Sequence, residues 1–302
     1  MAVFAPGHGR RAPVSDAAES TGRTDVVVVT YESERWIDGC LASLVDQPGV
    51  GQIVVVDNAS TDATGSMVAQ HAGRGVQWLA LGVNRGFGSA ANRGVASTLS
   101  AAVLILNPDL IVGPGAVQTL RSRLLTDAHL AIVGPAVTDL AGVPYPSARS
   151  FPNLVDAAGH AFAGLFWRDN PWSGRYLQPK RIDWVSGTAM LVRRDAFESV
   201  GGFDESYFMY VEDVDLCWRL TRAGWSVDVE DAAVVRHGVG GSSGRAPYRM
   251  IAAHHRSLWR FARRSATSTQ RLALPIVAVG LALRAGLVAL QHRRTGRPPA
   301  AR

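Results

Sequence analysis

Apolar residues occur in consecutive runs through the first half of the chain, and each run ends in polar residues. The runs at 26–29, 54–56 and 104–106 consist of Val, Ile and Leu. Runs of this kind are typical of strands buried on both faces of a sheet. Between them apolar residues recur at helical spacing, so strand and helix alternate. This alternation predicts an α/β fold with a mostly parallel central sheet and crossover helices.

The same periodicity gives approximate bounds for the remaining elements. Trp36, Cys40, Leu41, Leu44 and Val45 fall on one helical face after the first strand. Further strands are expected at 52–57, 76–81, 104–106, 130–137, 182–192 and, as one or two strands, 227–235, and further helices at 61–71, 87–98, 114–125, 195–200 and 213–223.

The chain divides into four parts by composition. Residues 1–24 are rich in Gly, Ala, Ser and Pro without an apolar core, which predicts a disordered leader and no signal peptide. Residues 25–240 form the expected main α/β domain, with a first half to about 137 and a second from about 138. The glycine-rich segment 238–244 is interpreted as a hinge, and 241–302 as a basic helical tail.

Periodicity breaks between 142 and 180, where prolines and aromatic residues cluster. Long loops in compact domains are usually functional or mobile. We interpret this one as a lid over an acceptor site, with an irregular packed loop as the equally good alternative.

The positive charge of the chain is confined to its tail. The net charge is +6, yet 241–302 contain 12 Arg and no Lys, Asp or Glu, which leaves 19 basic and 25 acidic groups in the rest. Without interleaved aromatic residues for stacking on bases, this tail fits an anionic membrane surface better than nucleic acid. A solvated basic tail is the alternative.

Residues 272–290 form a long apolar stretch with one charge, Arg284. Its length is close to that of a membrane-spanning helix, but an arginine inside a bilayer is costly and the alanines and glycines lower its hydrophobicity. A helix lying in the membrane interface is therefore preferred over a span or a soluble packing helix.

Composition limits the class of protein. With 302 residues, 47% of them hydrophobic, the chain can form one large α/β domain with a substantial core. Cys40 and Cys217 are the only cysteines, and both lie in helical patterns far apart. They indicate neither a disulfide framework nor a zinc site, and suit packing in a reducing compartment. The oligomeric state stays open.

Polar residues follow the strands at the edge where an open α/β sheet binds its ligands. Asp109 comes just after a buried run and can hold a hard divalent cation that bridges a diphosphate. Asp57 can accept a hydrogen bond from a pyrimidine ring. Asn84, Arg85 and Gly86 offer an amide, a guanidinium fork and close backbone approach, as a diphosphate or ribose requires.

Two further positions carry candidate chemistry. Glu212 and Asp213 are adjacent carboxylates at a predicted helix start, where they either stabilise the helix dipole or supply a general base to an incoming hydroxyl. His237 ends a strand and either completes a metal site or is a structural histidine.

These blocks together resemble a family-2 inverting glycosyltransferase with the GT-A fold, over about 25–264. The blocks are Thr30-Tyr31-Glu32, Asp57-Asn58, Asn84-Arg85-Gly86-Phe87-Gly88, Asn107-Pro108-Asp109, Trp184-Val185-Ser186-Gly187, Gly201-Gly202-Phe203-Asp204-Glu205 and Met209-Tyr210-Val211-Glu212-Asp213. Within that family the chain is similar to the actinobacterial branch that places L-rhamnose on N-acetylglucosaminyl-diphospho-decaprenol. Segments 143–149, 166–167, 170–172 and 252–256 carry this narrower resemblance.

The resemblance implies a role for each matching residue. Thr30, Tyr31, Glu32 and Asp57 are expected to hold the nucleoside, and Asn84, Arg85, Gly86 and Asn92 the ribose and diphosphate. Asn107 and Asp109 belong to the donor site, and Asp109 with His237 is expected to bind Mg2+ or Mn2+. Asn107 replaces an aspartate of many relatives, so the metal has one fewer anionic contact. Asp213 is the expected base with Glu212 beside it, and Trp184, Gly187, His254, His255 and Arg256 are acceptor-site candidates.

The resemblance also implies the reaction and its place. It implies transfer of L-rhamnose from dTDP-L-rhamnose to a polyprenyl-diphospho-N-acetylglucosamine, by an enzyme at the cytoplasmic face of the plasma membrane. Alternatives are another donor or acceptor within the same family, or a membrane-attached protein that binds nucleotide sugars without catalysis. A sugar nucleotidyltransferase is disfavoured because its glycine-rich basic loop is absent, and a processive synthase because no Gln-x-x-Arg-Trp motif occurs.

Overall fold

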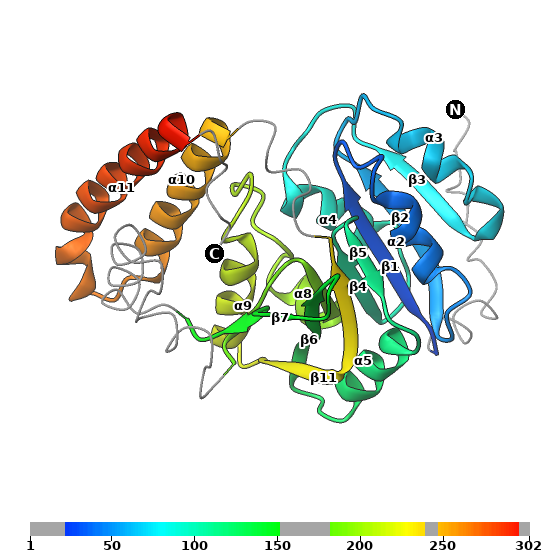
Figure 1. Ribbon diagram of the computed structural model, residues 1–302. Helices are drawn as coiled ribbons and strands as arrows, with labels where there is room; N and C mark the ends of the chain where they lie inside the picture. Colours follow the sequence, from blue (N-terminus) through cyan, green and yellow to red (C-terminus); the bar gives the residue numbers. More distant parts are fainter. Residues whose placement is uncertain (1–21, 152–181, 239–246, 296–302) are drawn as a thin grey trace, which may run out of the picture.

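Four parallel strands form the first half of the central sheet. The computed structural model describes residues 22–151, 182–238 and 247–295. Figure 1 shows the strands side by side in the order β3-β2-β1-β4. Their bounds are β1 Thr24–Thr30, β2 Val50–Asp57, β3 Val76–Ala80 and β4 Ala102–Leu106. This half confirms the predicted alternation of strand and crossover helix.

Strand β1 is buried on both faces, as its apolar run predicts. Val26 and Val28 pack in one core cluster with the apolar face of α2 (Ile37–Leu44). Val27 and Val29 lie in a second cluster with α4 (Phe87–Ala96). Alternate residues of a strand point to opposite faces, so two helical layers enclose the sheet.

The second half of the sheet is mixed. Strand β10 (Ala189–Arg193) lies antiparallel between β4 and β6 (Leu130–Asp139). Strand β11 (Ser226–His237) runs parallel to β6, and the three-residue β5 (Leu110–Val112) pairs antiparallel with β11. The prediction of an α/β fold with a mostly parallel sheet is confirmed, because β6 and β11 run in the same direction as β1 to β4, and only β5, β7 (Pro144–Tyr145) and β10 of the described sheet run antiparallel to their neighbours. A short strand such as β5 gives no periodicity that a sequence reading could detect.

Most of the remaining elements match predicted ones with shifted ends, whereas η1, β7 and β8 were not predicted. The predicted strand at 182–192 is interrupted at Gly187 and gives β9 (Trp184–Val185) and β10. The other elements are α3 Thr64–Ala69, η1 Ala72–Arg74, α5 Ala116–Leu125, β7 Pro144–Tyr145, β8 Ala148–Arg149, α8 Arg194–Ser199 and α9 Glu212–Arg222.

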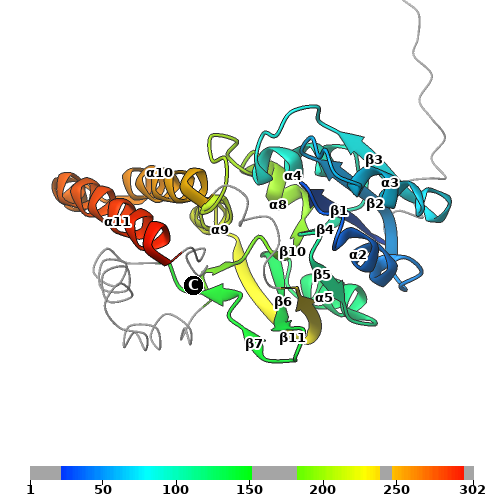
Figure 2. The same cartoon turned by 45° about the horizontal axis from the view of Figure 1, so that its top comes forward.

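The tail folds into two antiparallel helices beside the domain. Helix α10 (Pro247–Ser265) and helix α11 (Leu274–Thr295) pack on each other, joined through η3 (Gln270–Ala273). In Figures 1 and 2, α10 lies between α9 and α11, and α11 is outermost. Within the described residues, one helix, Gln270–Arg293, is long and apolar enough to cross a membrane.

Three predictions fall wholly or largely outside the described residues. They are the leader at 1–24, of which only 22–24 are described, the centre of the 142–180 loop and the hinge at 238–244. The described start of the loop forms β7, paired with β6, and β8, paired with β9.

Candidate active site

The ends of β1 and β2 meet in a hydrogen-bonded cluster around Asp57. Its side chain is buried, and Oδ1 accepts the hydroxyls of Thr30 at 2.9 Å and Ser60 at 2.5 Å. Oδ2 accepts the backbone N–H of Ser60 at 2.8 Å. Oδ2 therefore keeps acceptor capacity for a further donor such as a base N–H.

Tyr31 and Glu32 continue from β1 above this cluster. Glu32 has a left-handed backbone with φ of 52°, and its Oε1 accepts both the N–H and the hydroxyl of Thr61 at 2.9 Å. This pairing holds the start of the α3 segment against the end of β1. Tyr31 is 39% exposed, so its ring is accessible to a ligand.

The loop Asn84–Gly86 is held from two sides. Asn58 Oδ1 accepts the N–H of Arg85 at 3.1 Å, and Asn84 Oδ1 accepts the N–H of Gly86 at 3.0 Å. A Cβ at Gly86 would lie 2.0 Å from the carbonyl oxygen of Phe208, and the φ of Gly86 is +89°. Gly86 is thus required for close approach of two backbones. The Arg85 side chain is exposed beside it.

Asn92 makes contacts within the fold. Its Nδ2 donates to the carbonyl of Phe203 at 2.9 Å and to Glu205 Oε1 at 3.1 Å, and its Oδ1 accepts the N–H of Phe203 at 2.9 Å. These bonds fasten α4 to the loop before α9. The donor contact that the resemblance implied for Asn92 stays a prediction beside these structural bonds.

Asp109 and His237 meet although 128 residues separate them. His237 Nε2 lies 3.2 Å from Asp109 Oδ2, and the N–H of Gly238 donates to the Asp109 carbonyl at 2.8 Å. The antiparallel pairing of β5 with β11 sets His237 opposite Leu110, which explains the contact. The His237 ring packs edge-on against Tyr145 at 5.6 Å.

The chemistry of this pair fits a divalent metal. Asp109 Oδ1 and His237 Nδ1 are buried and have no hydrogen-bond partner. Buried polar atoms are rarely left unsatisfied, and a carboxylate suits hard cations such as Mg2+ or Mn2+, whereas an imidazole is a ligand of softer divalent cations. No cluster of three or more His, Cys, Asp or Glu residues that could hold a metal occurs in the described parts of the chain.

Glu212 and Asp213 begin α9 after a strained turn. Tyr210 and Val211 have φ of 68° and 69°, in the left-handed region that β-branched residues avoid. Such strain concentrates at functional sites. The turn directs Asp213 toward Gly187, whose N–H donates to Asp213 Oδ2 at 2.8 Å, while the N–H of Val214 donates to Oδ1 at 2.8 Å.

Burial and mutual repulsion perturb the two carboxyl groups. Burial, with the charge of Asp213, raises the pKa of Glu212 to about 8. Burial also raises the pKa of Asp213, while the N–H groups of Gly187 and Val214 and the charge of Arg149 act to lower it. Glu212 Oε2 is buried without a partner. The N–H bonds to Asp213 favour its ionised form and so oppose the effect of burial on its pKa.

A two-residue bridge connects the candidate base to the metal side. Gly187 bonds to Asp213, and the carbonyl of the next residue, Thr188, accepts the N–H of Asn107 at 2.9 Å. Asp213 and the segment 107–109 therefore flank the same turn between β9 and β10. Hydrogen bonds thus connect four separate parts of the chain, which are residues 107–109, 187–188, 213 and 237.

Arg149 is a candidate that the sequence reading did not single out. Its guanidinium lies over the Trp184 ring, 5.6 Å from the centroid, and its charge opposes the rise that burial causes in the pKa of Asp213. The Trp184 Nε1–H donates to the carbonyl of Ser150 at 3.2 Å. The segment 143–149, which carried the narrower resemblance, was the available signal for Arg149.

The residues 254–256 of α10 differ in their surroundings. His254 packs edge-on against Tyr210 at 5.2 Å, and burial with the charges of His255 and Arg284 lowers its pKa to about 4. His255 Nδ1–H donates to the Ile251 carbonyl at 2.7 Å and its Nε2 accepts from Arg284 at 3.1 Å. Arg256 is exposed. His254 is thus neutral at pH 7 beside the turn at Tyr210 and Val211, and His255 joins α10 to α11.

Comparison with known proteins places this geometry in a family. The model of glycosyl transferase family 2 matches residues 25–201. The N-acetylglucosaminyl-diphospho-decaprenol L-rhamnosyltransferase of Mycobacterium tuberculosis is 40% identical over 257 residues, which cover 78% of this chain and 82% of that protein. A rhamnosyltransferase of Escherichia coli K12 is 30% identical over 210 residues, 66% of this chain and 77% of its own.

A solved structure shows the same fold. The mannosyltransferase PcManGT from Pyrobaculum calidifontis, in complex with GDP-Man and Mn2+, has a TM-score of 0.57 and 18% identity, covering 93% of this chain and 78% of its own. The likeness at this identity shows the GT-A type of fold. With the family model matching more than half of the sequence, the chain belongs to glycosyl transferase family 2.

Proposed function

We propose that this protein is an inverting, metal-dependent rhamnosyltransferase. It transfers L-rhamnose from dTDP-L-rhamnose to polyprenyl-diphospho-N-acetylglucosamine in cell-wall linker synthesis. The support for the donor and acceptor is similarity to the M. tuberculosis rhamnosyltransferase over most of both chains. The observation that carries a transferase reaction is the bridge through Gly187 and Thr188, which links the Asp213 carboxylate to the segment of Asp109.

Asp213 is the proposed general base. Its carboxylate removes the proton of the acceptor hydroxyl, and that oxygen attacks the anomeric carbon as the bond to the diphosphate breaks. One displacement on the face opposite the leaving group inverts the anomeric configuration. A positioned base contributes about 10²–10⁴-fold to such a step. Protonated Glu212 keeps the local negative charge to one, which leaves Asp213 able to accept the proton.

The donor is held at the ends of β1, β2 and β4. Asp57 offers Oδ2 to the base, Tyr31 an accessible ring, and Arg85 an exposed guanidinium for phosphate oxygens. Asp109 and His237 are the proposed protein ligands of Mg2+ or Mn2+. When bound, the cation neutralises charge on the leaving diphosphate.

The acceptor approaches from the side of α9 and α10. Trp184, half-buried beneath the guanidinium of Arg149, is a proposed wall of the acceptor site, and Arg149 places positive charge beside Asp213. Of the three residues at 254–256, Arg256 is the proposed contact for the lipid diphosphate, because His254 and His255 are engaged within the protein. The proposed location is the cytoplasmic face of the plasma membrane.

Donor and acceptor panels test the proposal. Purified protein is incubated with Mn2+, polyprenyl-diphospho-N-acetylglucosamine and one of several nucleotide sugars, and the lipid product is identified by mass. The expected product carries one deoxyhexose from dTDP-L-rhamnose. Transfer from a different nucleotide sugar would replace the donor assignment, and nucleotide binding without any product would favour a non-catalytic binding protein.

A further inference from the structure

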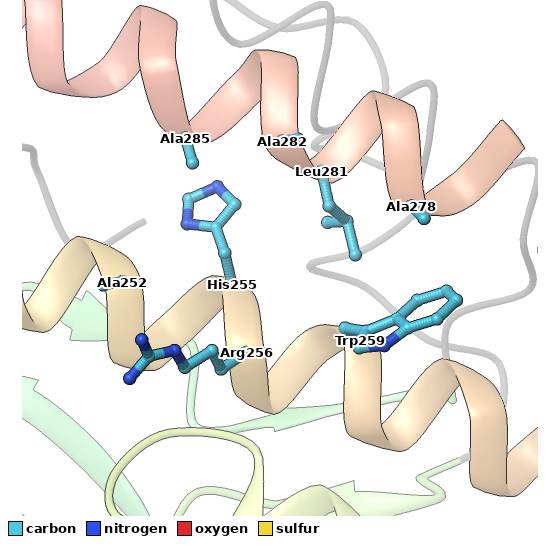
Figure 3. A pocket seen from close by; sticks show the side chains of 8 residues that line it. All are labelled: Ala252, His255, Arg256, Trp259, Ala278, Leu281, Ala282 and Ala285. Atoms are coloured by element: carbon cyan, nitrogen blue, oxygen red, sulfur yellow. The ribbon is translucent and has the colours of Figure 1, made fainter. Parts of the chain in front are cut away.

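Helix α11 is joined to the protein chiefly through α10. Its inner face presents Ala278, Leu281 and Ala285 to α10, across a shallow groove of about 350 Å3. Figure 3 shows His255 pointing from α10 toward α11 and Leu281 pointing back, with Trp259 beside it. The small side chains let α11 lie along α10, which leaves its other face outward.

That outward face is entirely apolar. Every exposed residue from Leu272 to Leu290 is aliphatic, proline or glycine. Leu272 is 84% exposed and Ile276 76% exposed. The larger side chains follow one another at spacings of three or four, which places them in one row along the helix. The row, called the outer stripe below, consists of Leu272, Ile276, Val279, Leu283, Leu287 and Leu290.

A continuous apolar surface of this kind marks an interaction site on a soluble domain. The charged residues around the outer stripe indicate the kind of partner that it binds. Arg271 and Arg293 stand at the two ends of the stripe and are exposed, as is Arg263 at the end of α10. No acidic residue occurs anywhere in 241–302. A row of aliphatic side chains framed by arginines complements the acyl boundary and headgroups of an anionic bilayer.

The orientation of α11 follows from Arg284. Its guanidinium turns inward and donates to Nε2 of His255 at 3.1 Å, away from the outer stripe. Crossing a bilayer would require α11 to leave α10 and carry this charge into hydrocarbon. The existing packing instead satisfies Arg284 while the stripe stays outward. Arg284, which would be costly inside a bilayer, is therefore compatible with a helix that lies on the membrane surface.

Helix α10 is in turn fixed to the catalytic turn. Ser257 Oγ donates to the carbonyl of Met209 at 2.9 Å, and Arg264 bonds Asp204 at 2.6 Å. The ring of His254 covers Tyr210, two residues before Glu212. Because α11 packs on α10 and α10 is bonded to this turn, a surface that binds α11 lies at a fixed position relative to Asp213.

We propose that the outer stripe docks on an anionic phospholipid bilayer with α11 lying along the surface, and that α10 sets the position of Asp213 relative to it. The proposal specifies the membrane partner of the proposed function, yet lipid binding itself requires no donor or acceptor. The occupant is the bilayer and not a second copy of the chain, because two such stripes would bring equal arginine clusters together.

Vesicle sedimentation tests the surface. The full chain is mixed with vesicles of phosphatidylcholine alone or with added phosphatidylglycerol, in low and high salt. The wild-type chain is expected to bind the anionic vesicles and to be weakened by salt. Ile276→Glu/Leu283→Glu should reduce binding by about tenfold or more, since two buried aliphatic contacts are lost. The matched change Leu99→Glu, at a residue 80% exposed on the catalytic domain, should bind as wild type.

Several results would overturn the proposal. Unchanged vesicle binding by the double variant would remove the stripe from the contact. Wild-type protein that resists release by alkaline carbonate would make α11 a span. If the wild-type protein were a dimer, the double variant a monomer, and neither bound vesicles, the outer stripe would be assigned to contact with a second copy of the chain. Thermal unfolding checks that each variant is folded. Transfer to a short, water-soluble acceptor should be unchanged in the double variant, so loss of docking is separable from failure of the proposed reaction.

Discussion

The backbone N–H of Gly187 donates a 2.8 Å hydrogen bond to Oδ2 of Asp213. Gly187 interrupts what would otherwise be one continuous strand, and a Cβ at this position would lie 3.3 Å from the ring of Phe87 and 3.5 Å from Cβ of Asp213. The break between β9 and β10 therefore provides both the donor for Asp213 and the space for its side chain. An N–H bond to a carboxylate favours its ionised form, which a general base requires.

Replacement of Asp213 by Asn should nearly abolish transfer. The amide keeps the size of the side chain but cannot accept the proton, so a loss of about 10²–10⁴-fold in kcat is expected. Nucleotide affinity should change little, because Asp213 does not contact the donor cluster around Asp57. Steady-state transfer and calorimetric nucleotide binding measure the two effects separately.

Asp231→Asn is a suitable comparison for this variant, since Asp231 is exposed on β11. It should transfer at the wild-type rate. If Asp213→Asn retained most of its activity, another group would have to act as the base.

Replacement of Glu212 by Gln should change how stability depends on pH. Glu212 has a pKa raised to about 8 by burial and by Asp213, from the ordinary value of 4.5. Above pH 4.5 the unfolded chain loses this proton while the folded chain keeps it, so the free energy of unfolding falls as pH rises toward 8. Below pH 4.5 the group is protonated in both states and has no such effect. Gln cannot ionise, so the variant should lose this decline and gain on the order of a few kcal/mol near pH 8.

Urea unfolding between pH 4.5 and 8, without nucleotide or metal, measures this change. Glu198→Gln provides the comparison, because the side chain of Glu198 is 62% exposed. Parallel pH profiles for wild type and Glu212→Gln would show that Glu212 ionises normally in the folded protein.

The sequence was sufficient to locate the first four strands of the sheet and the candidate residues that follow them. The valine runs of β1 and β2 are long, continuous and buried on both faces, so their ends and the residues after them could be placed correctly. Asp57 directly follows the apolar run at 54–56, and Asp109 follows the run at 104–106 after Asn107 and Pro108. Their chemical neighbourhood therefore followed from local pattern and from the parallel order of neighbouring strands.

Contacts made by loops and by the sheet's second half could not be read in the same way. Asn92 bonds to Phe203, 111 residues away, and no local periodicity encodes that pairing. Likewise the antiparallel insertion of β10 between β4 and β6 depends on a long connection. The pairing of His255 with Arg284 depends on how α10 and α11 pack, which the tail's composition alone did not reveal.

Replacement of Gly86 by Ala should destabilise the protein more than a change at another left-handed glycine. Gly82 has φ of +69° and open space around it, so Ala there costs conformational strain alone, about 1 kcal/mol. Gly86 has φ of +89° and also faces the carbonyl oxygen of Phe208, so Ala there must additionally push two loops apart. A loss on the order of 3 kcal/mol or more is expected. Urea unfolding of both variants compares them, and equal losses would show that the Phe208 loop yields freely.

Replacement of His237 by Ala should weaken the dependence of donor binding on a divalent cation. His237 Nε2 and Asp109 Oδ2 are 3.2 Å apart, and each side chain has a second, unpaired buried atom able to coordinate. Loss of even an outer-shell partner of a metal ligand typically costs about 10–100-fold in metal affinity, so removal of a direct ligand should cost at least as much. Calorimetric titration of dTDP with and without Mn2+ measures the gain in dTDP affinity that the metal provides.

The wild-type protein should bind dTDP more tightly with Mn2+, and His237→Ala should lose most of that gain while its metal-free affinity is kept. His129→Ala, at an exposed histidine outside the site, should retain the full gain. An undiminished Mn2+ effect in His237→Ala would leave His237 as a structural partner of Asp109 and Tyr145.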